Sequence, residues 1–354
     1  MKPGGSTGQQ GRLLRVIAFA LVLAAPARSE PVRFRLVDLG TLGGENSRAL
    51  AINRHGQVVG ESENAVGEIR AFLWSPGAAL RDLGTLGGMS SRAFAINADG
   101  LVVGEAENRG GDTGAFSWTA EDGMRALPST ARARYSAALA VNDRGWSAGT
   151  LEDDRGVHAV VWRQGDLVFI NRLPGAGNIQ PLGINNRGDL VGQIQAGAED
   201  DFTSLAFYYP RAADVRSLAE FRLLAPHGGS ALDINEEGLI AGAMMPDSAR
   251  MRAYRSRQGE APAALDGEDV FFSGAAAVNE AGDVVGSSIE SYGLDEAATL
   301  WRGGRRYNLN EVTDTTNAWW LIQAADIDDG GRIVGHGLLG ESHRAFLLEP
   351  MMAP

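Results

Sequence analysis

The sequence contains no cysteine, and only 13 of its 354 residues are proline. Without cysteine the chain can form neither disulfide bonds nor cysteine-ligated metal sites, and it has no thiol nucleophile. Its single lysine is Lys2, so every later base is arginine and the P-loop lysine that contacts phosphates is missing. A His-Glu-x-x-His metal motif is also absent. No short motif therefore identifies a reaction.

The N-terminus has the layout of an export signal. Lys2, Arg12 and Arg15 precede an apolar run over residues 16–25, and small residues follow it. The run of about ten residues is shorter than the roughly 20 that span a bilayer. We expect residues 1–29 to be a signal peptide, cleaved after Ala27 or Ser29; an uncleaved N-terminal anchor is the alternative.

The composition is that of an acidic globular protein. Apolar residues make up 44% and charged residues 21%, enough to build a large core. Cleavage after Ser29 removes four bases and no acids, which takes the net charge from −12 to −16. Such a charge repels phosphate backbones and anionic lipids. We expect a secreted or periplasmic bacterial protein, monomeric, that binds no nucleic acid and, once cleaved, no membrane.

A ten-residue frame occurs seven times along the chain. It begins as Ala51-Ile-Asn-Arg-His-Gly-Gln-Val-Val-Gly60 and returns as Ala95-Ile-Asn-Ala-Asp-Gly-Leu-Val-Val-Gly104. The third position of the frame is occupied by Asn53, Asn97, Asn142, Asn185, Asn235, Asn279 and Asp328. Successive spacings of 44, 45, 43, 50, 44 and 49 residues give seven units with a period of about 46.

Each unit predicts four short antiparallel strands. In the first, residues 47–52 alternate small and large side chains, and Asn53-Arg-His-Gly56 is a type I turn sequence that returns the chain as a second strand over 57–61. Residues 70–74 form the expected third strand and 80–83 the fourth. Four strands in about 46 residues are typical of one propeller blade.

The sequence therefore predicts an all-β protein, a seven-bladed β-propeller in which residues 30–354 form a single domain. Residues 32–39 resemble a fourth strand, whereas the last unit has only three, over 321–327, 332–337 and 344–348. The N-terminal strand can thus supply the outer strand of the last blade and close the ring. Six or eight blades are the alternatives.

Together with these frames, two further motifs resemble the HAF-repeat family of bacterial exported proteins. Residues 38–44 and 82–88 both read Asp-Leu-Gly-Thr-Leu-Gly-Gly. The His-Ala-Phe position of the family corresponds to Arg70-Ala-Phe72, Gly114-Ala-Phe116, His158-Ala-Val160, Leu205-Ala-Phe207 and Arg344-Ala-Phe346. No unit has all three residues together. The resemblance covers roughly residues 32–350 and implies an exported, propeller-like protein without a known activity.

Metal and cofactor sites find little support in the sequence. His336, Glu341 and His343 could form a metal site, but we interpret them as solvated residues of a loop in the last blade. The connections between second and third strands are acidic, which favours either ordinary solvated charge or a face that attracts Ca²⁺ or cationic partners. We expect no catalytic residues, no bound metal and no cofactor; Ca²⁺ is the alternative.

The tryptophans fall into two groups. Trp74, Trp118, Trp162 and Trp301 share the end of the third strand, and repetition in register predicts packing between blades. Trp319 and Trp320 lie outside the frame, in what we interpret as a long loop between blades. They are the candidate ligand-binding residues, and they could either stack on a sugar ring or plug the end of the channel, which we favour.

From the sequence we expect a non-catalytic binding or scaffold propeller whose partner is a small molecule, a glycan or a protein at the cell surface. Ligands would engage the acidic loop face or the central channel. A propeller enzyme of the lyase or glycoside hydrolase type, or a calcium-stabilised adhesin, are the alternatives. An enzyme requires non-repeating polar side chains from several blades to converge on the axis.

Overall fold

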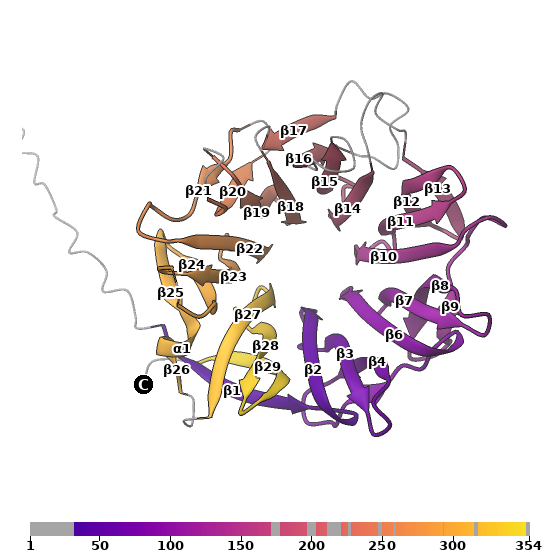
Figure 1. Cartoon of the computed structure of the whole chain (residues 1–354), viewed down its shortest axis with the longest axis horizontal. Coiled ribbons are helices and arrows are strands. Elements are labelled where there is room, and N and C mark those ends of the chain that lie inside the picture. The colour runs from indigo at the N-terminus through magenta and orange to yellow at the C-terminus, as the bar shows by residue number, and fades with distance from the viewer. Residues whose placement is uncertain are drawn as a thin grey trace, which may run out of the picture. The chain divides into compact units, whose positions relative to one another are not determined.

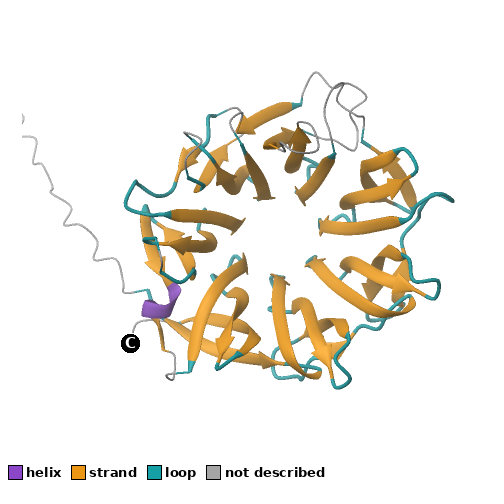
Figure 2. Cartoon of the chain, in the orientation of Figure 1, coloured by secondary structure: helices purple, strands orange, loops and turns teal. Residues whose placement is uncertain are grey.

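Seven blades of antiparallel strands are arranged in a ring around a central axis in the computed structural model (Figure 1). The described residues are 32–170, 178–196, 203–210, 221–225, 228–246, 250–257, 260–292, 294–314 and 318–351. They are almost entirely strands (Figure 2), and they form one compact unit. The fold is an all-β propeller with seven blades, as the repeat frame predicts.

The first three blades follow each other along the chain and each has four antiparallel strands. They comprise β2 (Gly43–Ile52), β3 (Val58–Asn64), β4 (Ile69–Trp74) and β5 (Arg81–Asp82); β6 (Gly87–Ile96), β7 (Val102–Asn108), β8 (Thr113–Thr119) and β9 (Gly123–Ala126); β10 (Tyr135–Val141), β11 (Ser147–Asp153), β12 (Gly156–Arg163) and β13 (Asp166–Phe169). One parallel bridge between Tyr135 and Thr113 links the second blade to the third.

Blades 4 to 6 repeat this order. They comprise β14 (Ile179–Ile184), β15 (Leu190–Ala196), β16 (Thr203–Tyr209) and β17 (Arg222–Ala225); β18 (Gly229–Ile234), β19 (Leu239–Met244), β20 (Arg252–Arg257) and β21 (Ala263–Ala264); β22 (Phe272–Val278), β23 (Val284–Ile289), β24 (Ala297–Arg302) and β25 (Arg305–Asn308). In every blade the first strand is the one nearest the axis (Figure 1).

Blade 7 is assembled from both ends of the chain. It contains β27 (Trp319–Ile327), β28 (Ile333–Leu339) and β29 (Ser342–Pro350), followed by β1 (Phe34–Gly40) as its outer strand. Strand β1 pairs antiparallel with β29, with Leu36 opposite Leu348, and its other edge pairs with β26 (Thr313–Asp314). The predicted closure of the ring by the N-terminal strand is thus confirmed.

The short helix α1 (Leu309–Val312) leads from blade 6 into blade 7 and is capped by the Asn308 side chain, which accepts from the backbone N–H of Asn310. In the described part of the chain no helix has the length and apolar character needed to cross a bilayer.

The frame recurs because its turn and its last glycine both have a steric function. The Asn53 side chain accepts hydrogen bonds from the backbone N–H of His55 and Gln57, and Gly56 has a φ of +74°, which other residues rarely adopt. Gly60 faces the inner strand so closely that a Cβ atom there would lie 2.0 Å from the carbonyl oxygen of Arg48. Gly104, Gly149, Gly192, Gly242, Gly286 and Gly335 meet the same obstacle.

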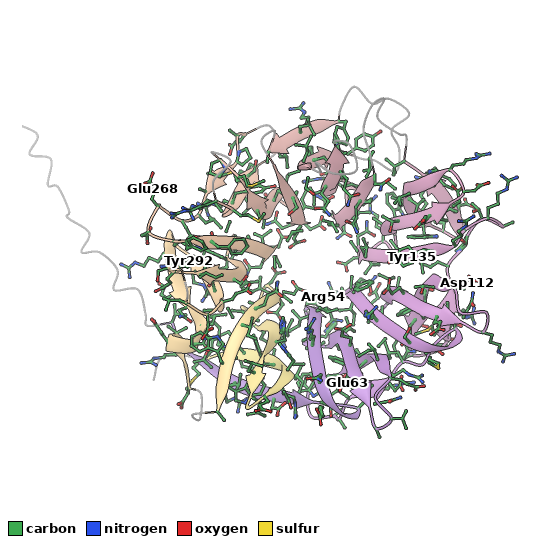
Figure 3. The ribbon with its side chains drawn as sticks, in the orientation of Figure 1. Arg54, Glu63, Asp112, Tyr135, Glu268 and Tyr292 are labelled. Carbon is green, nitrogen blue, oxygen red and sulfur yellow. The ribbon has the colours of Figure 1, made fainter. Side chains whose placement is uncertain are left out.

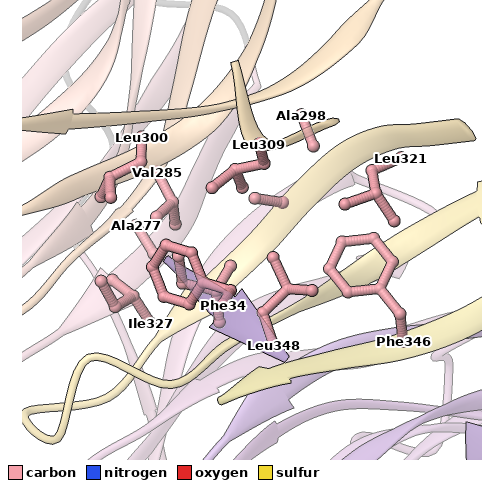
Figure 4. Close-up of a cluster of buried hydrophobic side chains, with 12 residues drawn as sticks. Phe34, Ala277, Val285, Ala298, Leu300, Leu309, Leu321, Ile327, Phe346 and Leu348 are labelled. Carbon is pink, nitrogen blue, oxygen red and sulfur yellow. The ribbon is translucent and has the colours of Figure 1, made fainter. Parts of the chain in front are cut away.

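The core lies between neighbouring blades. Third strands contribute the fully buried Phe72, Phe116, Phe207 and Phe346. The repeated tryptophans are between 3% and 8% exposed, and each belongs to a different cluster of buried hydrophobic side chains: Trp74, Trp118, Trp162 and Trp301. Their predicted packing role is thus confirmed. At the junction of blades 6 and 7, Phe34 packs with Leu300 and Leu348 (Figure 4).

The closing strand should therefore stabilise the whole ring. We expect Phe34→Ala to lower the free energy of unfolding by about 3–5 kcal/mol, because Phe34 is 1% exposed and its removal leaves a cavity. Urea unfolding measures the change. Arg35→Ala is the control: Arg35 lies on the same strand, but its exposed ion pair with Glu349 is worth about 1 kcal/mol or less. Equal losses in the two variants would contradict the role of this strand.

Candidate functional site

Two cavities lie on the propeller axis. One, of about 260 Å³, is enclosed by the first hairpin turn of every blade and includes the frame asparagines Asn53, Asn97 and Asn142. The other, of about 240 Å³, is lined by the inner strands, mainly by alanine, leucine, isoleucine and valine. Arg54, at the first of these turns, is labelled beside the central opening in Figure 3. The axis thus holds one cavity bordered by the hairpin turns and another bordered by the inner strands.

A ring of side-chain amides links the blades at the hairpin turns. Each Asn Nδ2 donates to the backbone carbonyl of the equivalent residue in the next blade, at 2.9–3.3 Å. Six such bonds run from Asn53 through Asn97, Asn142, Asn185, Asn235 and Asn279 to Asp328. The frame asparagine therefore shapes its own turn with one atom and binds the next blade with another.

The seventh link needs a different donor. Asp328 stands where the other units have asparagine, and a carboxylate cannot donate. Arg332 takes over this role: its Nε donates to Asp328 at 2.6 Å, and its Nη2 donates to the carbonyl of Arg54 in blade 1 at 2.8 Å. The seam between the last and first blades is therefore closed by an arginine as well as by β1.

A second set of links surrounds the polar mouth. The backbone N–H of Asn186 donates to Glu236, that of Glu236 to Glu280, and that of Glu280 to Asp329, at 2.7–2.9 Å. Burial raises the pKa of Glu236, and repulsion from the Glu280 and Asp143 carboxylates raises it further. The carboxylates at the mouth thus serve as acceptors for the neighbouring blade.

Two aspartates interrupt the row of small residues at the first frame position, on the inner strands. The first frame position is Ala51, Ala95, Ala140, Gly183 and Ala277 in five units, but Asp233 and Asp326 in the others. Asp233 accepts the backbone N–H of Ile234 and of Val278 in the next blade, both at 2.8 Å. Asp326 accepts those of Ile327 and of Ile52 across the seam, also at 2.8 Å.

These two carboxyl groups are hard to ionise. Both are enclosed by protein while keeping some surface in the channel. Burial raises the pKa of Asp233 to about 6, and burial together with repulsion from Asp233 raises that of Asp326 to about 7, against the pull of the N–H groups. Because each oxygen already accepts an inter-blade or local N–H, we interpret both as links between blades.

A chain of charged side chains crosses the first three blades away from the axis. Arg92 Nε donates to Glu61 at 2.8 Å and its Nη1 to Glu105 at 2.9 Å, while the Tyr135 hydroxyl donates to Glu105 at 2.6 Å. Burial and the Glu105 charge raise the pKa of Tyr135, so it stays a donor. Arg48 stands at the other end, 3.9 Å from Glu61. Equivalent positions of blades 4 to 6 have Gln180, Ser230 and Gly274 in place of Arg48.

A cavity of about 240 Å³ lies beside Arg48, where blade 7 meets blade 1; we call it the seam cavity. Its lining residues are Asn46, Ser47, Arg48, Glu61, Ser62, Glu63, Ile69 and His343. Figure 3 labels Glu63 on blade 1. The Glu63 carboxylate is already engaged: it accepts the backbone N–H groups of Glu45 and Asn46 and the Asn46 side chain, which lower its pKa.

The histidines of blade 7 are not the solvated loop residues that the sequence suggested. His336 lies in β28 and His343 in β29, and their ring centroids are 5.7 Å apart. Burial lowers the pKa of His336 to about 4, helped by the positive charge of Arg48 and by His343. That interpretation was wrong because the turn between these strands spans only residues 340–341, so both histidines belong to the strands on either side of it. Within the described ranges, no group of three or more His, Asp or Glu side chains could hold a metal ion.

The structure also corrects the placement of Trp319 and Trp320. They are the first two residues of β27, on the inner strand of blade 7, and do not lie in a loop. Trp319 packs against the core between blades 6 and 7, whereas Trp320 is 37% exposed and its indole N–H donates to the carbonyl of Glu296. Neither is among the residues that line the two channel cavities.

One catalytic sequence motif is present without the structure that it requires. Gly145-Trp-Ser-Ala-Gly149 matches the Gly-x-Ser-x-Gly nucleophile motif, which needs an exposed serine between a strand and a helix. Here Ser147 begins β11 inside a hairpin and is 2% exposed. The match is a variant of the repeat frame and carries no nucleophile.

Comparisons with known proteins agree on the fold and give no family. No known protein family matches the chain, and no curated protein does. Among solved structures, the β-propeller domain of the Trilobed protease from Pyrococcus furiosus matches with a TM-score of 0.57 and 12% identity, over 92% of this chain and 96% of that one. That domain is described as having an open velcro topology, whereas here β1 pairs with β29.

Two peptidases match through part of their length. Pyrococcus horikoshii acylaminoacyl peptidase has a TM-score of 0.56 at 11% identity, over 89% of this chain and 54% of that one. A Mycobacterium tuberculosis puromycin-hydrolyzing peptidase has 0.53 at 14%, over 85% and 51%. This chain thus spans about half of each peptidase. At such identities the likeness shows the propeller fold alone.

The channel aspartates predict a pH-dependent stability. A carboxyl whose pKa is higher in the folded than in the unfolded state binds more protons when the protein is folded. Its contribution to the free energy of unfolding therefore declines as pH rises through the folded-state pKa. We expect the wild type to lose unfolding free energy, relative to an Asp233→Ala/Asp326→Ala variant, as pH rises from 5 to 8. Urea unfolding at each pH measures the difference.

The variant is a suitable reference because alanine occupies the same position in four other blades. His336, whose lowered pKa has the opposite effect below pH 6.5, is present in both proteins and cancels. A difference that stays constant with pH would show that the two carboxyls ionise normally.

Proposed function

We propose that this protein is an exported, non-catalytic binding propeller that holds a small polar ligand in the seam cavity. One observation supports the site above others. In the described part of the chain, the cavity holds the half-exposed guanidinium of Arg48 at 3.9 Å from the Glu61 carboxylate, too far for a hydrogen bond, so both groups can still bind a ligand.

The channel is a weaker candidate for ligand chemistry. Its amides and carboxylates are used to join blades. The Asp233 and Asp326 pair, with raised pKa values, is the feature that favours the enzyme alternative. Both carboxyls already accept two N–H groups each, however, which supports a structural role.

Export to the periplasm or the medium is part of the proposal. It is supported by the signal-like layout of residues 1–29, the absence of cysteine and the resemblance of residues 32–350 to HAF-repeat proteins. A ring closed by main-chain pairing and by Arg332, rather than by disulfides, suits a compartment of either redox state.

A thermal-shift screen tests this function. The protein is heated with a library of neutral, acidic and basic small molecules and short peptides; we expect at least one class to raise the Tm. Arg48→Ala should abolish that shift, while Arg35→Ala, far out on β1, should keep it. The ligand should be recovered chemically unchanged. Conversion of the ligand to a product would instead support an enzyme.

A further inference from the structure

The seam cavity contains both hydrogen-bond donors and hydrogen-bond acceptors that are not used within the protein. Arg48 carries five N–H donors, and its contact of 3.9 Å with Glu61 is too long for a hydrogen bond. Glu61 uses one oxygen for Arg92 at 2.8 Å, so the other faces Arg48 with lone pairs to spare. A ligand group that both accepts and donates, as a hydroxyl does, matches this pair better than a group that only accepts.

The charges around the cavity disfavour an ionised ligand. Glu61 is neutralised by Arg92 and Arg48, but Glu63 is stabilised only by N–H groups and keeps its charge. The protein as a whole carries a net charge of −12. An anion would be repelled by Glu63 and by the negative net charge of the protein, whereas a cation would be repelled by the Arg48 guanidinium. A neutral ligand avoids both repulsions.

The remaining walls set size and shape. At about 240 Å³ the cavity is smaller than the roughly 300–1,000 Å³ of pockets for drug-sized ligands, so it suits a single small ring. Ile69 provides an apolar wall, while Asn46 and Ser62 provide polar ones. One face of the ligand should therefore be apolar and its rim hydroxylated.

We infer that the seam cavity binds one neutral sugar ring, with its hydroxyl groups between Arg48, Glu61 and His343. A hydroxyl accepts from the Arg48 guanidinium and donates to the free oxygen of Glu61, while the His343 ring forms part of the wall beside them. The C–H face of the ring lies against Ile69. This inference rests on the proposed binding function, because it names the ligand class of the same site.

Matched sugars test the inference. Binding of D-glucose, D-galactose and D-mannose is compared with that of their uronates and hexosamines, by titration calorimetry or ligand-observed NMR on the wild-type protein. We expect at least one neutral hexose to bind about tenfold more tightly than its charged counterparts. Arg48→Ala should weaken that binding by at least about tenfold, and Arg35→Ala should leave it unchanged.

The outcomes separate the ligand class from the function. If a uronate or a hexosamine binds best and needs Arg48, the inferred class is wrong and the binding function stands. If no sugar binds but another compound raises the Tm in an Arg48-dependent manner, the class is again wrong. If no compound of any kind depends on Arg48, both the inference and the proposed site are overturned. Urea unfolding of Arg48→Ala verifies that the variant is folded.

Discussion

The ring of frame asparagines is the interaction on which the rest of this structure depends. Each carboxamide both shapes the first turn of its own blade and donates to the main chain of the next, so local turn chemistry and global closure use the same side chain. Because the donors and acceptors are buried, a broken link leaves main-chain groups unsatisfied and costs more than an exposed hydrogen bond would. The inner strands are thereby held at a fixed spacing around the axis.

Such a frame allows few amino-acid substitutions at its repeated positions and more at the positions between them. Gly60 and its equivalents cannot carry a side chain, and the turn asparagines cannot change without losing a link. The residue after each frame glycine is free to vary: it is Glu61 in blade 1, Gln193 in blade 4 and His336 in blade 7. The seam, where Asp328 and Arg332 replace the amide link, is also where the polar cavity forms.

Much of the fold could be predicted from the sequence because it depends on local, repeated chemistry. The Asn-x-x-Gly turn, the four strands and the closing role of residues 32–39 all follow from spacing and alternation. The candidate site could not be predicted in this way. Arg48 and Glu61 face each other across the first hairpin of blade 1, but His343 is far away in the sequence and joins them only where blade 7 packs on blade 1. Trp319 and Trp320 break the repeat pattern in the sequence, yet in the structure they are the first two residues of a strand.

Removing one ring amide tests the role of the asparagine ring most directly. Asn142→Ala deletes the donor to the Asn185 carbonyl and the acceptor for the N–H groups of Arg144 and Trp146. If the ring holds the blades, urea unfolding will show a loss of about 1–3 kcal/mol in a single transition. Asn178→Ala, whose amide donates to the Gln195 side chain, will stay within about 0.5 kcal/mol of the wild type. Equal stabilities of the two variants would contradict the central role of the asparagine ring.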